Sequence, residues 1–305
     1  MEIHRGRPAG ISRDGLRPAG ETERVTVPEV AFVNGRFLPL ADAVVSIEDR
    51  GFQFGDGVYE VIRTYRGRPF EVDAHLERFD RSAGTLELKQ PYSHARWRQL
   101  IEEGIRRAAY PEAKVYLQIT RGAAPRDHVY TADLMPTTVM TVREIQPLSP
   151  IVRAAGVEAI TAEDIRWGRC DIKSVNLLAN VLARQHGKQA GVFETILLKD
   201  GMVTEGAVSN VMLVRDRSVI TAPEGPRILS GVTRALVLQL AREQGIPVQE
   251  RYPSQADLQG ADEVFLTGTT VEVLSVIKID GRIVGQGQPG SITRQLAEKF
   301  AMRTG

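Results

Sequence analysis

The chain contains one cysteine, Cys170, among its 305 residues. A single thiol excludes an internal disulfide and a metal site built from several thiolates, and it fits a reducing, cytoplasmic setting. The 5 histidines are scattered without the close spacing of a zinc site, so we expect no bound metal. No apolar run approaches the roughly 20 residues that a membrane span requires, so we expect no membrane partner.

An excess of charge of one sign is also missing. The chain has 39 basic and 38 acidic residues, a net charge of +1, which leaves no basic field for a nucleic acid backbone or an anionic membrane. Small molecules are therefore the expected partners. With 42% hydrophobic residues, the chain can bury a full core.

The opening stretch, MEIHRGRPAGISRDGLRPAG, contains charge, glycine and proline but no apolar segment. This composition is unlike that of a secretory signal, and it offers little surface to bury. We expect residues 1–27 to form a flexible N-terminal extension and the folded part to begin near Val30.

Turn and periodicity signals predict both strands and helices in the first half. Asn34-Gly35, between two apolar stretches, is typical of a tight hairpin turn. Apolar residues recur at helical spacing after Asp73, which we expect to cap that helix, and again through residues 97–105. We therefore predict an α+β domain here.

Pro147 and Pro150 favour an extended connection over a helix, and we place a domain boundary there. The chain then has a small α+β domain at 28–147 and a larger domain at 148–305. Hairpins interspersed with single helices favour a mixed sheet in the second domain. We expect its strands at 157–161, 193–198, 209–214, 247–251 and 263–267, and its helices at 174–189, 233–244 and 291–303.

Lys173 has an unusual setting for a lysine in this chain. It follows Arg166 and Arg169 and directly precedes the helix predicted at 174–189. Nearby cations and an apolar wall disfavour the charged amine, and a neutral amine is the nucleophile that forms imines with carbonyls. A structural lysine paired with Asp171 is the alternative, and the spacing alone favours that structural role.

Several stretches, taken together, carry more information than Lys173 alone. The stretches are EDRGFQFGDGVYEV, TRGAAPRDH, EDIRWGRCDIKSVNLLANVLA, VTEGAVSNV, ILSGVTR and FLTGTT. In order and spacing they resemble the motifs of the fold type IV pyridoxal-phosphate aminotransferases, and within that group most of all the D-amino-acid aminotransferases. The resemblance extends from about Ala31 to the C-terminus.

This resemblance implies a two-domain α+β enzyme of fold type IV whose larger domain binds pyridoxal 5'-phosphate. It also implies a homodimer. The implied reaction is a ping-pong transfer of an amino group between D-amino acids, such as D-alanine or D-glutamate, and 2-oxo acids, such as 2-oxoglutarate or pyruvate.

The same resemblance assigns roles to individual positions. Lys173 would hold the cofactor as a Schiff base and move the substrate's α-proton. Glu205 would face the pyridine nitrogen, where a carboxylate stabilises the protonated ring. The other cofactor-binding positions, most of them around a phosphate at a helix start, are Arg78, Leu229, Gly231, Val232, Thr233 and Thr269. The substrate-binding positions are Tyr59, Thr270, and the pair Arg126 and His128, which match a trap for the substrate α-carboxylate.

The chain departs from the typical D-enzyme pattern at two places. Ala207 and Val208 precede Ser209 where serines are usual, and Gly268 also replaces a serine. Each change removes a hydroxyl near the cofactor or substrate, so a more apolar pocket that favours larger apolar side chains is expected.

Several other functions stay open on this evidence. Within the enzymes they are a branched-chain L-amino-acid aminotransferase, an (R)-selective amine aminotransferase and an aminodeoxychorismate lyase, against which Arg126 and His128 argue by resemblance. Outside the enzymes, the alternative is a protein that carries the cofactor without turnover. The presence of Lys173, Glu205 and Arg78 argues against that alternative.

Overall fold

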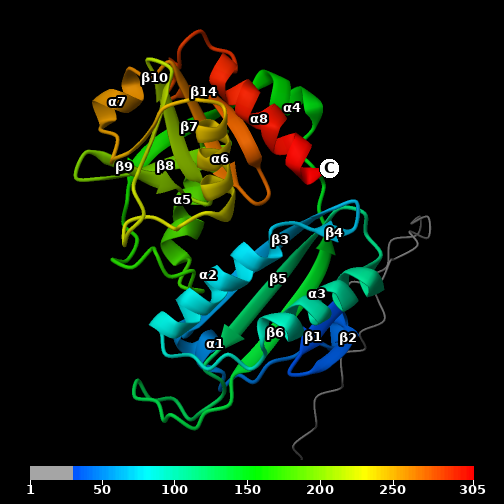
Figure 1. Ribbon diagram of the computed structural model, residues 1–305. Coiled ribbons are helices and arrows are strands. Elements are labelled where there is room, and N and C mark those ends of the chain that lie inside the picture. Colours follow the sequence, from blue (N-terminus) through cyan, green and yellow to red (C-terminus); the bar gives the residue numbers. More distant parts are fainter. Residues whose placement is uncertain (1–29) are drawn as a thin grey trace, which may run out of the picture.

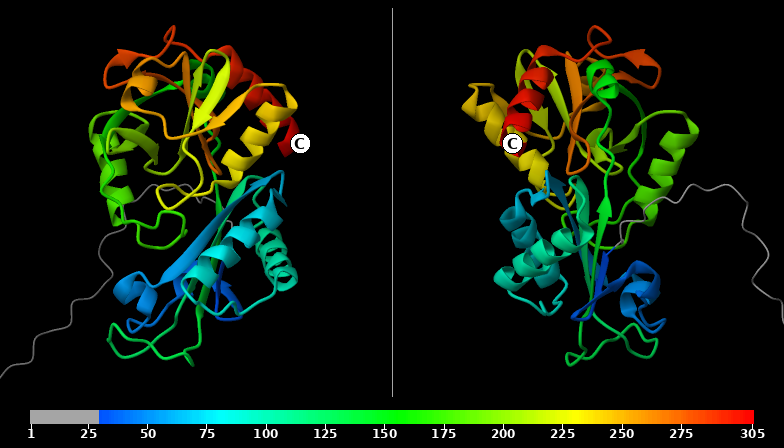
Figure 2. Two further views of the ribbon diagram at one scale, coloured as in Figure 1. Left: turned by 60° about the vertical axis from the view of Figure 1, so that its left-hand side comes forward. Right: turned by 90° about the vertical axis from the view of Figure 1, so that its right-hand side faces the viewer.

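The computed structural model describes residues 30–305, and the extension expected at 1–27 lies outside the described residues. The described chain forms two units stacked on each other (Figures 1 and 2). The small unit, residues 30–144, contains a six-stranded sheet in the order β2-β1-β6-β5-β3-β4. The large unit, residues 150–305, contains a nine-stranded sheet in the order β12-β11-β10-β13-β14-β7-β8-β9, with β15 paired to β14. The predicted α+β class is confirmed.

The small unit begins with the predicted hairpin. Asn34 and Gly35 have φ values of 45° and 92°, the left-handed values that a tight turn between right-twisted strands requires. The elements of the small unit are β1 (Val30–Val33), β2 (Arg36–Pro39), η1 (Leu40–Asp42), α1 (Arg50–Phe54), β3 (Gly57–Tyr65), β4 (Arg68–Pro69), α2 (Val72–Thr85), α3 (His94–Ala108), β5 (Ala113–Thr120) and β6 (Thr137–Glu144).

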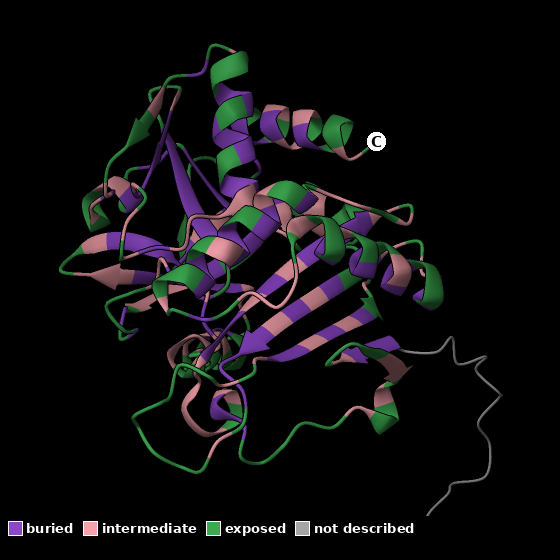
Figure 3. Cartoon of the chain, turned by 60° about the horizontal axis from the view of Figure 1, so that its bottom comes forward, coloured by how far each residue is buried: buried purple, intermediate pink, exposed green. Residues whose placement is uncertain are grey.

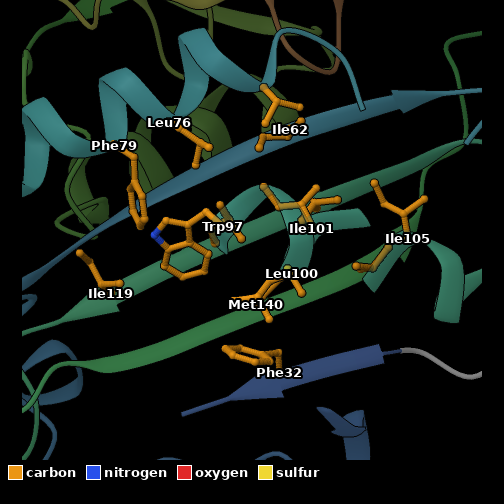
Figure 4. Packing of buried hydrophobic residues seen from close by; sticks show 14 of the residues in the cluster. Phe32, Ile62, Leu76, Phe79, Trp97, Leu100, Ile101, Ile105, Ile119 and Met140 are labelled. Carbon is orange, nitrogen blue, oxygen red and sulfur yellow. The ribbon is translucent and has the colours of Figure 1, made fainter. Parts of the chain in front are cut away.

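Helices α2 and α3 cover one face of the first sheet. Strand β5 alternates buried residues with more exposed ones, as a sheet with one covered face requires (Figure 3). Phe79 and Trp97 meet edge to face at 5.8 Å and pack with Ile101 and Met140 in the core (Figure 4). The apolar helix faces read from the sequence therefore form this core.

Two local predictions for these segments are wrong. Asp73 does not cap α2: the N-cap is Glu71, and Asp73 lies in the first turn, where it pairs with Arg98 of α3. Pro150 does not extend the connection but begins α4, because Ser149 caps that helix and the first turn needs no N–H from proline. The chain passes from one unit to the other between Glu144 and Pro150, and the division at 147/148 stays a prediction.

The large unit has the mixed sheet that we predicted. Strands β7 and β8 are parallel, as are β7 and β14, whereas β10, β13 and β14 pair antiparallel. In the large unit, strands β9, β11, β14 and β15 and helices α4 and α7 were not predicted, and neither was α1 in the small unit. The elements are α4 (Pro150–Ala155), β7 (Val157–Glu163), α5 (Leu178–Gln189), β8 (Glu194–Lys199), β9 (Met202–Gly206), β10 (Asn210–Arg215), β11 (Ser218–Thr221), α6 (Val232–Glu243), β12 (Val248–Glu250), α7 (Gln255–Gln259), β13 (Glu263–Gly268), β14 (Glu272–Ile279), β15 (Arg282–Ile283) and α8 (Ser291–Thr304).

The helix predicted directly after Lys173 begins only at Leu178. The intervening residues instead pair with the start of β3 in the small unit. The N–H of Tyr59 donates to the Lys173 carbonyl at 3.0 Å, and the N–H of Val175 donates to the Gly57 carbonyl at 3.1 Å. These bonds satisfy backbone groups that a helix would otherwise use, and they fix the segment that carries Lys173 against the small unit.

Candidate active site

A cavity of about 710 Å³ lies where the two units meet. Its walls come from β3 and α2 of the small unit and, in the large unit, from the segment that carries Lys173, from α5, from the ends of β9 and β13 and from the start of α6. Nine of the positions singled out in the sequence line it: Tyr59, Arg78, Lys173, Glu205, Leu229, Gly231, Val232, Thr233 and Thr269.

Lys173 presents its amine to this cavity. Nζ lies 4.2 Å from the centroid of the Tyr59 ring, which itself stacks on Tyr116 at 5.5 Å. The backbone N–H of Lys173 donates to Ser82 Oγ at 3.1 Å. Asp171 pairs with Arg169 at 2.8 Å, so Asp171 is engaged by a different cation.

Glu205, at the end of β9, is surrounded by donors. Arg166 forms an ion pair with one carboxylate oxygen, Asn210 Nδ2 donates to the other at 2.9 Å, and the N–H of Leu229 reaches both at 3.2 and 3.1 Å. Burial raises the pKa of the Glu205 carboxyl to about 7, and Arg166 acts against that rise. A further cation placed at this carboxyl would favour its ionised form.

Arg166 is itself fixed by a second carboxylate. Its Nε and Nη2 donate to Asp164 at 2.9 and 2.7 Å, and Nη2 also donates to the Arg227 carbonyl at 3.1 Å. The guanidinium is therefore held in one orientation beside Glu205. Arg166, Asp164 and Asn210 were not predicted as site residues, because nothing in their local spacing distinguishes them from surface polar residues.

Arg78 on α2 is buried in an ion-pair network with Glu60 of β3. Its Nε and Nη2 donate to the two Glu60 oxygens at 2.7 and 2.8 Å, and its Nη1 donates to the Ser230 carbonyl at 2.9 Å. His75 Nδ1 lies 2.8 Å from Glu60. Burial alone would raise the pKa of Glu60, but Arg78 and His75 outweigh it and hold that pKa well below its usual range. Arg78 thereby joins the small unit to the segment before α6.

The start of α6 has the features of an anion site. Its N-cap, Gly231, lies on the cavity wall, and no side chain of the described residues caps the helix. Free N–H groups and the positive end of the helix dipole favour an anion at such a position. A Cβ on Gly231 would come within 2.1 Å of Asn210 Oδ1, so only glycine permits this close approach.

Two further groups complete a donor set for a phosphate. The Thr267 hydroxyl is buried in the cavity wall and has no hydrogen-bond partner within residues 30–305. Arg78, which also lines the cavity, donates a hydrogen bond to the carbonyl of Ser230, the residue before Gly231. An uncapped helix start, an orphaned hydroxyl and a guanidinium fit the phosphate of pyridoxal phosphate, and the position of Glu205 on the same cavity fits its ring nitrogen.

Arg126, His128 and Thr270 do not line this cavity. Arg126 and His128 lie on the exposed loop between β5 and β6, with the Arg126 guanidinium 4.6 Å from the Phe54 ring centroid. Thr270 is exposed, and its carbonyl accepts a bond from Arg63 at 3.5 Å. The described chain therefore does not bring the expected carboxylate trap to Lys173.

The positions that depart from the D-enzyme pattern do line the cavity. Ala207, Val208 and Gly268 contribute to its wall together with Ser209. Within residues 30–305 no cluster of three or more potential metal ligands occurs. In the same part of the chain, no helix has both the length and the apolar character for crossing a bilayer.

Comparison with known proteins identifies relatives of nearly full length. The sequence model of the family described as Amino-transferase class IV matches residues 57–279. A D-alanine aminotransferase from Bacillus licheniformis is 44% identical over 263 residues, which make up 86% of this chain and 93% of the relative. A D-alanine aminotransferase from Listeria monocytogenes is 42% identical over 271 residues, 88% and 93% of the two chains.

Solved structures share the same architecture. The Escherichia coli branched-chain amino acid aminotransferase superposes with a TM-score of 0.84 at 26% identity, covering 90% of this chain and 94% of that one. The branched-chain aminotransferase from Thermoproteus uzoniensis, solved with norvaline, gives a TM-score of 0.81 at 26% identity and covers 90% and 94% of the two chains. The chain therefore belongs to the class IV aminotransferases, enzymes that depend on pyridoxal phosphate.

Proposed function

We propose that this protein transfers amino groups between D-amino acids and 2-oxo acids, with each active site assembled from two copies of the chain. The observation that carries the proposal is the identity of 44% and 42% with two D-alanine aminotransferases over most of both lengths. Each of the two branched-chain structures shares only 26% of its residues with this chain. A cytoplasmic location, expected from the single cysteine, remains part of the proposal.

Different residues of the cavity would bind the phosphate and the ring of the cofactor. Arg78, the first N–H groups of α6 and the hydroxyls of Thr267 and Thr269 would hold the phosphate, and Glu205 would hold the protonated ring nitrogen. When bound, pyridoxal phosphate supplies the electron sink that allows the α-C–H bond of an amino acid to break. Arg166 fixes the Glu205 carboxylate for that role.

Lys173 would both anchor the cofactor and move the proton. Its Nζ lies in the cavity beside the Tyr59 ring, where an amine can accept the α-proton of a bound amino acid and return a proton in the reverse half-reaction. Since Lys173 acts from one fixed place, the enantiomer that reacts depends on which side of the pocket holds the α-carboxylate.

The carboxylate trap would come from a second copy. Arg126 and His128 lie outside the cavity of their own chain, on an exposed loop beside exposed apolar side chains. A second exposed apolar set surrounds the segment that carries Lys173. Several exposed apolar side chains gathered on neighbouring segments support an interface, here with another copy of the chain. The exposed residues are Val44, Ile47, Phe52, Val129 and Met135 in the small unit and Ile165, Leu178, Val181, Leu182 and Val208 in the large unit.

A substrate panel tests the reaction. D- and L-forms of alanine, glutamate and leucine would be supplied with 2-oxoglutarate as acceptor, or with pyruvate for glutamate, and specificity constants compared. We expect the D-forms to be favoured. A preference for L-leucine would instead assign the protein to the branched-chain enzymes.

Mixed dimers test the trap. Arg126→Leu should weaken use of D-alanine by roughly 2 to 5 kcal/mol, the range for removing one partner of a buried charge pair, and should spare an (R)-amine that has no carboxylate. Co-refolding Lys173→Ala chains with Arg126→Leu chains should restore activity, because one site of each mixed dimer then has both residues intact. No recovery on mixing would place the two residues in the same chain's site.

A further inference from the structure

The turn at residues 269–271 joins β13 to β14 and extends from the large unit to β3 of the small unit (Figure 1). Gly268 pairs with Glu272 across its base, and Thr269 lines the cavity. The turn is thus, like the segment that carries Lys173, a point at which the large unit meets both the cavity and the other sheet.

Glu272 closes this turn in an unfavourable backbone conformation. Its φ is 61°, in the left-handed region where a side chain is sterically disfavoured and where hairpin turns usually have glycine or asparagine. The left-handed conformation costs a residue with a side chain about 1 to 2 kcal/mol, which side-chain contacts can offset. The carboxylate of Glu272 has such partners.

Those partners come from both units. Glu272 Oε1 pairs with Arg63 of β3 at 2.6 Å and accepts from the Tyr65 hydroxyl at 3.0 Å. Glu272 Oε2 pairs with Arg153 of α4 at 2.7 Å. We call Glu272, Arg63, Arg153 and Tyr65 the Glu272 clamp. Glu112 also contacts Arg63, at 3.2 Å, so two carboxylates balance two guanidinium groups.

The same two arginines also contact the backbone of the turn. Arg63 Nη1 lies 3.5 Å from the Thr270 carbonyl, and Arg153 Nη1 lies 3.4 Å from the Val271 carbonyl. Arg63 is buried, and β3 also carries Tyr59, which lines the cavity. Each guanidinium thus joins the Glu272 carboxylate to a carbonyl of the turn.

We propose that Glu272 is a positioning residue: through Arg63 and Arg153, the Glu272 clamp fixes the turn 269–271 against the small unit and so sets Thr269 for the cofactor. The clamp couples the strand that carries Tyr59 to the turn that carries Thr269. The proposal rests on pyridoxal phosphate as cofactor and is independent of the handedness of the substrate.

The test compares Glu272→Gln with Glu272→Gly. Glutamine keeps the size and the backbone strain but removes the charge, whereas glycine removes both the charge and the strain. Amide hydrogen exchange of residues 268–272 is measured in cofactor-free protein, and pyridoxal phosphate is titrated into each variant. We expect both variants to exchange faster in the turn and to bind pyridoxal phosphate about tenfold more weakly, as for the loss of a preorganised loop.

Arg153→Gln provides a second variant, because the Arg153 side chain is 28% exposed and its loss threatens folding less. It should shift both readouts in the same direction, and its effect should not add to that of Glu272→Gln. Glu158→Gln is the control. Glu158 lies on β7 and forms an exposed pair with Lys278 of β14, the strand that also contains Glu272, and its replacement should change neither hydrogen exchange in the turn nor pyridoxal phosphate affinity. Recovery of wild-type affinity in Glu272→Gly would overturn the proposal, as would unchanged hydrogen exchange in the turn of all three clamp variants.

Discussion

Replacing Glu60 by glutamine tests the network that holds Arg78. Glu60 is fully buried and binds Arg78 through two hydrogen bonds of 2.7 and 2.8 Å. Glutamine has nearly the same shape, but it removes the negative charge and turns an NH₂ group toward a donor of Arg78 or His75. The buried guanidinium then keeps its charge without a compensating carboxylate.

The expected loss follows from this geometry. Removing one partner of a buried, well-paired ion pair costs about 3 to 5 kcal/mol, a large share of a typical unfolding free energy of roughly 5 to 15 kcal/mol. At about 2 to 4 °C per kcal/mol, the melting temperature should fall by about 10 °C. The measurement is urea or thermal unfolding of the cofactor-free protein, so that no phosphate supplies the missing charge.

The dependence of the unfolding free energy on pH gives an independent check. The pKa of Glu60 is lowered by folding from an ordinary value of 4.5, so its contribution is complete above that value and is lost as the pH falls. The stability difference between wild type and Glu60→Gln should therefore be constant above about pH 6.5, the ordinary pKa of the neighbouring His75, and the part that Glu60 itself contributes should be lost on acidification below about pH 4.5. Glu158→Gln, at an exposed pair, should stay within about 0.5 kcal/mol of wild type. A loss below about 1 kcal/mol for Glu60→Gln would refute the reasoning.

Three further changes probe the cavity. Lys173→Ala should abolish transamination together with the yellow absorption of the lysine-bound cofactor, and retained absorption would mean that another lysine carries it. Glu205→Gln should keep the cofactor but lower turnover about a hundredfold, since an amide stabilises a protonated ring nitrogen less than a carboxylate does; an unchanged turnover number would remove that role. Gly231→Ala should weaken pyridoxal phosphate binding by roughly tenfold, because the new Cβ would approach Asn210 Oδ1 to 2.1 Å. Equal pyridoxal phosphate titration curves for the variant and the wild type would show that the start of α6 adapts to the added methyl group.

Much of the local structure was determined by the sequence alone. Asn34-Gly35 predicted its hairpin, because the backbone conformation of a two-residue turn depends on the turn residues themselves. The apolar spacing around Trp97 predicted α3 and its buried face, since helical periodicity is written into neighbouring residues. The motifs around Lys173, Glu205 and Gly231 identified the family for the same reason: each is a short, contiguous stretch.

The arrangement of the site depended on contacts that no local pattern contains. Arg166 reaches Glu205 across 39 positions, and Arg78 reaches Ser230 across 152. Helix α5 begins later than its apolar residues predicted, because the residues after Lys173 pair with β3 of the other unit. Only the tertiary structure places Arg126 outside its own chain's cavity, since the position of a loop residue is set by the sheets that carry the loop and not by its neighbours in sequence.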